Sequence, residues 1–421
     1  MFFVLLVTLF IILIYIGVPI SFVIGITSLI GISLVPGIPI ITVPMKMFNG
    51  LNSFVLVAVP LYIFTANIMN KGTISRKLID FSLALVGQIR GGLALSNVLV
   101  SMFFAGISGA AQADTAGIGK ILIPNMMRTG YDREMAVGVT AASSTIGVII
   151  PPSIPMIIYG GLTNTSVGAL FLAGVVPGVL IGLGMMILVY ITSIRKGIPK
   201  YKTTSLKKII RLFIHTFPAL LVPVIIIGGI VTGVFTATEA AAISSLYALI
   251  LGFFFYRTIK IKDLPEILTD TLKLSCLALF ALSTASALGE LLGYFELSQL
   301  TERLFTTYMN ESWIFMCVVI IFFLFVGTFM DSIPAMILFV PVILPTALKL
   351  GFDPLHLGII IVITLAIGLV TPPYGLCLLI ASKISKMPIE KSFRAVLPYI
   401  SVEFIVLLLI ALYPQLTLIF R

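Results

Sequence analysis

One interruption pattern occurs twice in this chain, with the same internal spacing each time. The first copy runs from Gly130-Tyr131-Asp132 through Gly147 to Pro151-Pro152, and the second from Gly351-Phe352-Asp353 through Gly368 to Pro372-Pro373. Proline breaks helices because it lacks a backbone N–H and its ring clashes with the preceding turn, and glycine weakens them. Two breaks with the same spacing, both in strongly apolar surroundings, predict a duplicated unit that contains an interrupted helix in each copy.

Composition places these breaks in a membrane. Hydrophobic residues make up 59% of the chain and charged residues only 10%, a balance that a soluble globular protein does not have. Allowing roughly 20 residues per span, we expect roughly ten to twelve spans, some of them broken or re-entrant, in an all-α polytopic fold.

The apolar run 2–34 starts without a basic leader, so we expect a retained first helix and no signal peptide. The three cysteines are scattered and predict neither a disulfide framework nor a zinc site.

The net charge of +10 is concentrated in one loop. Seven basic residues and no acidic one lie between positions 195 and 211: Arg195, Lys196, Lys200, Lys202, Lys207, Lys208 and Arg211. Under the positive-inside rule this loop is cytoplasmic. Without interleaved aromatic residues or a soluble domain, the cluster does not indicate nucleic-acid binding.

The basic loop divides the chain into comparable halves, 1–194 and 212–421, each with one copy of the pattern. In each half a short apolar stretch precedes a polar break and another follows it, which predicts a helical hairpin that enters the membrane and returns to the same side. The predicted hairpin tips are 106–115 and 327–332, and the predicted broken helices are 147–153 and 368–373. Duplicated breaks of this kind are typical of secondary transporters. The residues alone leave open whether the copies are inverted or parallel.

The paired prolines are expected to free backbone carbonyls. Pro151 and Pro152 leave the carbonyls of Gly147 and Val148 without helical donors, and the second break does the same for Gly368 and Leu369. Since an orphan carbonyl in hydrocarbon costs several kcal/mol, each needs a partner. We expect that partner to be a sodium ion; a plain kink, with the carbonyls satisfied by nearby Ser or Thr hydroxyls, is the alternative.

Hydroxyls and two acidic side chains stand close to the breaks. The hydroxyls are Ser143, Ser144, Thr145 and Ser153 near the first break, Thr371 inside the second, and Ser108, Thr115, Thr328 and Ser332 at the hairpin tips. Asp114 and Asp331 each lie ten residues before a proline, and a carboxylate at membrane depth is a functional candidate. Either could instead cap the returning helix of its hairpin. Asp132 and Asp353 are predicted to be surface helix caps, and Glu239 to stabilise the start of an apolar helix with a neighbouring threonine.

At these residues the sequence resembles the large membrane subunit of tripartite ATP-independent periplasmic (TRAP) transporters, and the match runs over nearly the whole chain. The matching segments are Gly106 to Thr115, Gly130-Tyr131-Asp132, Gly147 to Ser153, Thr236 to Ala241, Gly327 to Asp331 and Gly368 to Pro373. The resemblance implies inverted repeats, two re-entrant hairpins, and a transport domain that moves like an elevator against a scaffold, driven by a sodium gradient.

The resemblance also implies partners and site residues. It implies a small four-helix membrane subunit, supplied by a separate chain, and a soluble periplasmic binding protein that delivers a small organic anion. One sodium site would involve Ser108, Gly147, Ile150 and Pro152, and the other Gly327, Gly368, Thr371 and Pro373. Asp114, Thr115, Ser153, Thr328 and Asp331 would support the substrate site and the hairpin tips.

We therefore predict sodium-coupled uptake of a small organic acid across the lipid bilayer of the bacterial cytoplasmic membrane. Acidic sugars such as sialic acid, dicarboxylates and keto acids are all open as substrates. Two alternatives stand beside this prediction. One is a self-sufficient ion-coupled anion carrier that needs no binding protein. The other is a polytopic membrane enzyme with Asp114 and Asp331 as a catalytic carboxylate pair.

Overall fold

The structure is a computed structural model that describes residues 2–71, 74–198, 200, 204–296, 299, 303 and 312–419. Every named element in these ranges is helical, and the one isolated β-bridge pairs Arg90 with Lys200. The elements are α1 Phe2–Tyr15, α2 Ile20–Ser33, α3 Thr42–Leu51, η1 Phe54–Val57, α4 Ala58–Lys71, α5 Ile74–Val86, α6 Gly92–Ser108, α7 Ala111–Arg128, α8 Arg133–Ser144, η2 Thr145–Val148, α9 Ile154–Thr163, α10 Val167–Arg195, α11 Leu206–Val231, α12 Ala237–Ile250, η3 Leu251–Phe255, η4 Ile261–Asp263, α13 Leu264–Tyr294, α15 Ser312–Gly327, α16 Ser332–Lys349, α17 Pro354–Gly368, α18 Leu376–Ser385, α19 Ile389–Leu412 and α20 Gln415–Leu418.

The all-α polytopic fold predicted from composition is confirmed. Seven of the described helices are long and apolar enough to cross a membrane, and seven apolar helices are shorter. Five of the short ones are arms of the predicted hairpins and halves of the predicted broken helices: α6, α9, α15, α17 and α18. The other two are Leu5–Tyr15, within α1, and Ile20–Ser33, which is α2. They are short because the apolar run 2–34 is divided at Gly17, whose φ is +88°, and α2 begins only after Pro19.

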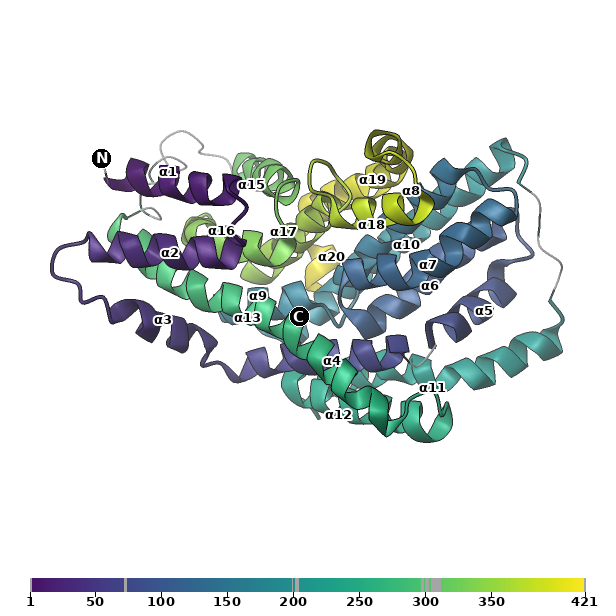
Figure 1. Ribbon diagram of the computed structural model, residues 1–421. Helices are drawn as coiled ribbons and strands as arrows, with labels where there is room; N and C mark the ends of the chain where they lie inside the picture. The colour runs from purple at the N-terminus through teal and green to yellow at the C-terminus, as the bar shows by residue number, and fades with distance from the viewer. Residues whose placement is uncertain are drawn as a thin grey trace.

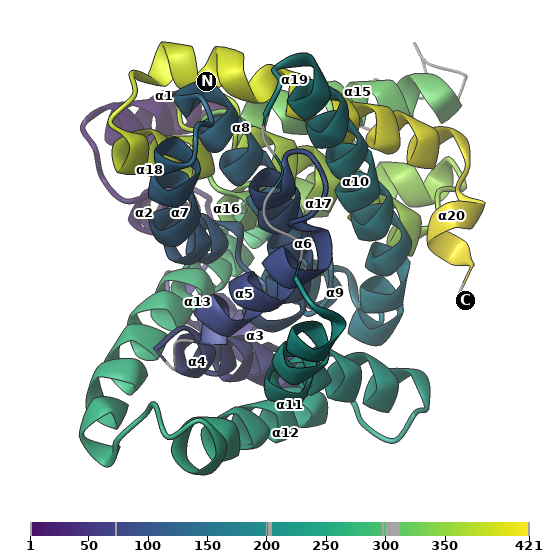
Figure 2. The same cartoon turned by 90° about the vertical axis from the view of Figure 1, so that its right-hand side faces the viewer.

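The helices form two bodies that lie against each other (Figures 1 and 2). In one body, α13 packs along α2, α3 and α4, while α12 packs on α4 and on α11. The other body holds the hairpins α6–α7 and α15–α16, the broken helices, and the long helices α10 and α19. The helix α5 joins them, since it packs on α11 on one side and on α6 on the other.

The two copies of the duplicated unit exchange their last helices. The helix after the first break, α9, packs on α16 and α17 of the second copy, and the helix after the second break, α18, packs on α7 and α8 of the first. Tyr159 of α9 donates a hydrogen bond to the carbonyl of Pro354 at 2.6 Å, and its ring lies so close to Gly358 that a β-carbon there would be 2.5 Å from it. Each copy is therefore completed by the other.

The two hairpins enter from opposite sides of the membrane. The base of the first lies beside the basic loop, because Asp132 pairs with Lys196 and Arg90 bridges to Lys200. The base of the second lies where α9 ends and α10 begins, as the bond from Tyr159 to Pro354 shows. Since α10 has 29 residues, about 44 Å of helix, and ends in the basic loop, that base lies on the opposite side. The copies are inverted, which the sequence had left open. Lys202 of the basic loop lies outside the described residues.

The predicted surface caps are confirmed. Asp132 accepts a hydrogen bond from the backbone N–H of Met135 at 2.7 Å, and Asp353 accepts one from that of Leu355 at 2.8 Å. Thr236 and Glu239 form a reciprocal capping box at the start of α12. These caps fix where α8, α12 and α17 begin, and for α8 and α17 they set the length of chain between the cap and the break that follows it.

Candidate functional site

The tip of the first hairpin brings a serine and an aspartate together. α6 ends at Ser108, Gly109 turns the chain with a φ of +64°, and α7 begins at Ala111. This tight turn places Asp114 in the first turn of α7, where its Oδ1 accepts a hydrogen bond from the hydroxyl of Ser108. Asp114 does not cap the helix, because the N-cap residue is Ala110 and no side chain caps that end.

The second oxygen of Asp114 faces the first break. This atom, Oδ2, is buried and has no hydrogen-bond partner in the described part of the chain. A β-carbon at Gly147 would lie only 2.2 Å from it, so the carboxylate sits directly against the glycine backbone. An acceptor held in that position, with Ser108 on its other oxygen, is an incomplete polar group that a cation or a donor would complete.

The first break is buried except at Ile150, which is partly exposed, and it is closed by Ser153. The chain narrows to a 3₁₀ turn over Thr145–Val148 and restarts as α9 at Ile154. Ser153 caps α9 by accepting from the N–H of Met156, and its hydroxyl donates to the carbonyl of Val148 at 2.6 Å. The expectation that this carbonyl needs a ligand from outside is therefore wrong, and the alternative given with it, a nearby hydroxyl, holds for Val148.

The second break also satisfies its own carbonyls. Gly368 accepts from the N–H of Thr371 at 3.1 Å, and Leu369 accepts from the N–H of Cys377 at 3.0 Å. The prolines remove helical donors as expected, but the chain tightens into an i to i+3 turn and then folds back on itself. Three of the four carbonyls predicted to be free thus have protein donors. Each carbonyl oxygen keeps a second lone pair that can still serve as a ligand.

The second hairpin lies against the second break through glycines. A β-carbon on Gly368 would be 2.6 Å from the carbonyl carbon of Gly327, so two backbones meet without side chains between them. The N–H of Tyr374 donates to the carbonyl of Thr328 at 2.8 Å. The hydroxyl of Thr371 donates to the carbonyl of Ile367 at 2.9 Å and therefore points back along its own helix. The first copy has a similar link, from the N–H of Ile154 to the carbonyl of Gly109 at 3.3 Å.

The remaining predicted residues lie at the same junctions but face different environments. The carbonyl of Pro152 is 2.8 Å from where a β-carbon on Gly109 would be, so it borders the first tip. Ile150 packs against Gly178 of α10. Pro373 is exposed, as are Phe329 and Tyr374 at 53% and 40%, whereas the first break is buried from Gly147 to Val148 and again over 151–153. The second break is thus the side of the site that a ligand can reach.

One hydrogen bond joins the two hairpin tips directly. Gln112, at the start of α7, donates through Nε2 to Oδ1 of Asp331 at 3.0 Å. Asp331 is also the N-cap of α16 and accepts from the N–H of Ser332 at 2.8 Å. Asp331 is therefore a cap, whereas Asp114 is not. Asp114 and Asp331 are equally far from a downstream proline, but they occupy different positions in their helices. Asp331 lies one residue before the start of α16, whereas Asp114 lies three residues after the start of α7.

Buried hydroxyls of α8 form hydrogen bonds with α6 and α7 next to the first break. Thr115 pairs with Ser144 at 2.6 Å, Ser101 pairs with Ser143 at 3.0 Å, and Asn97 donates to Thr140 at 2.6 Å. The hydroxyls of α8 are thus mostly engaged with neighbouring helices. Their contacts hold α6, α7 and α8 together, which fixes the position of the break relative to the hairpin tip.

Glu403 is a site residue that the sequence analysis missed. It is fully buried in α19, and its Oε1 accepts a hydrogen bond from the hydroxyl of Thr145, which begins the first break, at 2.8 Å. Its Oε2 is buried and has no partner among the described residues. A signal was present, because Glu403 is the only charged residue between Arg394 and Arg421 and stands at membrane depth.

The donor set suits a hard cation better than a transition metal. Across the described residues, no group of three or more His, Cys, Asp and Glu side chains is placed to hold a metal. What the junctions offer instead is oxygen from separate segments: the carboxylates of Asp114, Asp331 and Glu403, hydroxyls and backbone carbonyls. Oxygen ligands are those preferred by hard cations. His356, which the sequence did not propose as a ligand, interacts through Nδ1 with the hydroxyl of Thr417 at 2.8 Å.

Comparison with known proteins agrees with this arrangement. A family described as "Tripartite ATP-independent periplasmic transporter, DctM component" matches residues 7–416. The chain is 37% identical over 406 residues to the sialic acid TRAP transporter large permease protein SiaM of Vibrio cholerae, covering 96% of this chain and 95% of that protein. It is also 37% identical to the C4-dicarboxylate TRAP transporter large permease protein DctM of Pseudomonas aeruginosa, covering 89% and 88%.

Two further similarities bear on architecture. The isethionate TRAP transporter permease protein DctMQ of Oleidesulfovibrio alaskensis is 34% identical, over 96% of this chain but only 64% of that longer protein. Among solved structures, the Alcanivorax borkumensis YdaH transporter, whose topology is described as unusual, aligns with a TM-score of 0.64 over 89% of this chain and 87% of its own, at 11% identity. At that identity the likeness shows a shared fold.

These matches decide between the readings of the sequence. The relatives are transporter permeases, so the reading of Asp114 and Asp331 as a catalytic pair in a membrane enzyme is wrong. With its seven long apolar helices, the chain is a multi-pass protein of the bacterial inner membrane. The protein belongs to the DctM component family of tripartite ATP-independent periplasmic transporters, as a large membrane permease.

Proposed function

We propose that this permease couples the uptake of a small organic anion to the entry of sodium, and that it moves its site across the membrane by an elevator motion. The relatives named above are described as carrying sialic acid, C4-dicarboxylates or isethionate, which share an acidic group. A small organic acid is therefore the substrate class that we propose.

The observation that carries the sodium coupling is the free oxygen of Asp114. A buried carboxylate oxygen without a donor is unfavourable by several kcal/mol, and it lies beside Gly147 where the helix is interrupted. Ser108 and Gly147 lie directly against Asp114, and with Ile150 and Pro152 of the same break they would hold one sodium ion. A second would lie among Gly327, Gly368, Thr371 and Pro373, where carbonyl oxygens and a hydroxyl are available. Both ions would be co-transported substrates that leave the protein on the cytoplasmic side.

The start of α18 is the best supported place for the anionic group of the substrate. Its N-cap residue, Gly375, offers no side-chain cap, whereas Ser153 caps the matching end of α9. The N–H of Cys377 is bonded to the carbonyl of Leu369, but the rest of the first turn has no side-chain cap, and its N–H groups together with the positive end of the helix dipole favour an anion. Tyr374 and Pro373 beside it are exposed, so the position is accessible. Thr115, Ser153, Thr328 and Asp331 would shape the site around it.

The packing of the helices supports an elevator motion. The hairpins and broken helices interlock through α9 and α18, and so form a unit that can move as a whole. The body of α2, α3, α4, α11, α12 and α13 flanks it and would serve as the scaffold. A motion of one body past the other would carry the site across the membrane without rebuilding it.

We further propose two protein partners. A periplasmic binding protein would deliver the substrate, and a small four-helix membrane subunit would pack on the scaffold. The relative named DctMQ is longer than the part that this chain matches, which supports a second membrane component. If this chain accumulates anions in vesicles without any soluble partner, the self-sufficient carrier is the correct alternative.

Transport by reconstituted vesicles tests this proposal. The chain, its membrane subunit and its binding protein are placed in liposomes, and uptake of labelled sialic acid, succinate or isethionate is followed with sodium or with potassium outside. We expect accumulation of one of these anions only with an inward sodium gradient. Changing Ser108→Ala together with Thr371→Ala should raise the sodium concentration needed for half-maximal uptake.

Matched changes away from the breaks provide the control. Ser401→Ala and Thr232→Ala remove hydroxyls that bond within their own exposed helix turns, to Pro398 and to Gly228. These changes should leave sodium dependence as it is. Accumulation that is equally fast in potassium, or sodium dependence that survives the Ser108 and Thr371 changes, would show that the proposed coupling is wrong.

A further inference from the structure

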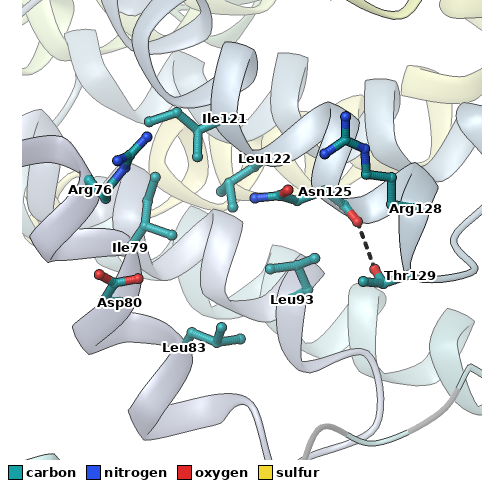
Figure 3. A pocket seen from close by; sticks show the side chains of 10 residues that line it. All are labelled: Arg76, Ile79, Asp80, Leu83, Leu93, Ile121, Leu122, Asn125, Arg128 and Thr129. Carbon is teal, nitrogen blue, oxygen red and sulfur yellow. Dashed lines mark hydrogen bonds between the residues drawn. The ribbon is translucent and has the colours of Figure 1, made fainter.

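A cavity outside the proposed site lies between α5, α6 and α7 and has a volume of about 590 Å³ (Figure 3). Its lining comes mostly from α5 and α7, with Leu93 from α6 as the floor between them. The volume falls in the range of roughly 300–1,000 Å³ typical of small-molecule sites. Neither the sodium sites nor the proposed substrate position uses any of the residues that line it.

The polar lining of this cavity is predominantly cationic. Arg76 of α5 and Arg128 of α7 stand at opposite ends, and the side-chain amide of Asn125 points into the space between them (Figure 3). Neither arginine forms an ion pair with any residue in the described ranges. Asp80 is the one acidic residue of the lining, and it is influenced by Lys208 as well as by Arg76. The local balance is therefore positive, with two guanidinium groups available to an anion.

The cavity also offers a surface for an apolar body. Ile79 and Leu83 line it on α5, Ile121 and Leu122 on α7, and Leu93 on α6. Cationic donors together with an apolar wall are what a small organic acid requires, since its carboxylate needs charged donors and its carbon skeleton needs burial. An inorganic anion would use the first feature alone.

The cavity lies on the cytoplasmic side of the first hairpin. Thr129, in its lining, is three residues from Asp132, which pairs with Lys196 of the basic loop. The helix α7 runs from the hairpin tip at Ala111 to this base, so the cavity lies along its cytoplasmic half, about 15 Å from the tip at Ile121. One wall, α5, packs on α11, and the other belongs to the hairpin.

From this geometry we infer that the cavity is a cytoplasmic exit site, in which Arg128 and Arg76 from its two ends and Asn125 between them bind a small organic acid on its way from the transport site to the cytoplasm. The inference rests on the proposed function, and it adds a second binding position to that route. Arg128 on the hairpin and Arg76 on the neighbouring helix approach the anion from different elements. A relative displacement of the hairpin would separate the two guanidinium groups and release the anion.

Binding at the cytoplasmic face tests this inference. Inside-out vesicles that contain the assembled transporter are supplied with labelled succinate, sialic acid or isethionate in sodium-free medium, and saturable binding is measured. We expect Arg128→Gln and Arg76→Gln each to weaken binding by about tenfold or more, since each removes a charge-assisted donor. Arg128→Lys should fall in between, because it keeps the charge and loses the planar fork.

The matched control is Lys120→Gln. This change removes one positive charge from the same helix, α7, at an exposed residue that does not line the cavity. Its binding should stay within about twofold of that of the unchanged protein. Melting temperatures of all variants show whether any of them has failed to fold, and Arg128→Lys then carries the comparison.

Several outcomes would overturn the inference. One is saturable binding that is the same in both arginine variants as in Lys120→Gln, and another is the absence of binding to the unchanged protein. A third is a variant that loses bound phosphatidylglycerol, measured in vesicles with and without that lipid, while soluble anions bind as before; the arginines would then hold a lipid headgroup. Uptake driven by sodium in the unchanged protein is measured in parallel, so that failure of the proposed function is seen separately.

Discussion

Gly147 offers the sharpest test of the first cation site. Gly147→Ala adds one β-carbon, which would lie 2.2 Å from Oδ2 of Asp114 and 3.5 Å from Cα of Ala111. Ordinary contact begins near 3.4 Å, so the carboxylate has to retreat by about 1 Å. Its other oxygen is bonded to Ser108, which limits how far it can turn. The backbone at Gly147 is not left-handed, so the change tests space alone.

The size of the effect follows from overpacking. Extra carbon atoms in a well-packed interior cost about 1–3 kcal/mol. If that strain falls on the position of the Asp114 oxygen, sodium should bind about 5- to 150-fold more weakly. The assay is the dependence of anion uptake on external sodium in proteoliposomes. We expect half-maximal uptake to need correspondingly more sodium, with little change in the substrate concentration required when sodium is saturating.

A helical glycine elsewhere in the membrane provides the control. A β-carbon at Gly228, in α11, would meet nothing within 4 Å, so Gly228→Ala makes the same chemical change without the clash. The double variant Asp114→Ala with Gly147→Ala removes the clash and the ligand together, and it should regain thermal stability but not sodium dependence. If Gly147→Ala and Gly228→Ala show the same sodium dependence, the Asp114 oxygen is not part of a sodium site and the reasoning fails.

Three further predictions concern polar groups outside that contact. Gln112→Ala removes the hydrogen bond to Asp331 and should lower the free energy of unfolding by about 1–3 kcal/mol, because a hydrogen bond to a charged group is lost. The melting temperature should fall accordingly. Glu403→Ala should destabilise the protein by a similar amount, since it opens a buried void beside Thr145, whereas Glu403→Gln should retain most of the stability. Burial raises the pKa of Asp80, which lies on α5 outside the candidate spans, so anions should bind more tightly in the cytoplasmic cavity as the pH falls through that pKa; Asp80→Asn should bind tightly throughout and remove this dependence.

The sign of the Asp80 effect follows from the charges that face it. Desolvation favours the neutral form and so raises the pKa, while Arg76 on the same helix and Lys208 on α11 oppose that rise. Across the cavity stands Arg128, on α7. Protonated Asp80 no longer offsets these cations, hence the stronger anion binding at lower pH. Binding that is independent of pH in the unchanged protein would contradict this, as would a pH dependence that persists in Asp80→Asn.

For the other two predictions, the comparisons are made with isosteric or exposed changes. A melting temperature in Glu403→Ala equal to that of Glu403→Gln would mean that the carboxyl group is not packed against the break. For Gln112→Ala, the reference is Thr269→Ala, whose exposed hydroxyl bonds to the carbonyl of Pro265 in its own helix. Equal melting temperatures in these two variants would show that the link between the hairpin tips adds no stability.

The positions of the breaks were predictable because they rest on local covalent chemistry. Proline cannot donate a hydrogen bond wherever it occurs in a membrane helix, so both interruptions were correctly located from Pro151-Pro152 and Pro372-Pro373 alone. The surface caps at Asp132 and Asp353 follow from equally local bonds. Whether the predicted ions bind at these breaks stays a prediction.

What depends on contacts between distant segments was not predictable. The bond from Ser153 to Val148 is local and fits the alternative of a nearby hydroxyl, whereas the bond from the N–H of Cys377 to Leu369 forms only because the chain folds back after the prolines. The pairing of Gln112 with Asp331 joins residues 219 positions apart, and that of Thr145 with Glu403 joins residues 258 apart. No spacing rule reaches across such separations. An isolated acidic residue in an apolar run, such as Glu403, shows from the sequence that burying its charge is unfavourable, but not which residue it contacts.

The exchange of α9 and α18 between the two copies has a consequence for how the protein is made. During synthesis, α9 is made before α16 and α17, the helices of the second copy on which it packs. The surface of α9 that contacts them therefore has no protein partner when α9 first enters the membrane. The early half must wait in the lipid, and it closes only when α18 arrives to fill the groove of α7 and α8. Each half therefore reaches its final packing only when the other is present.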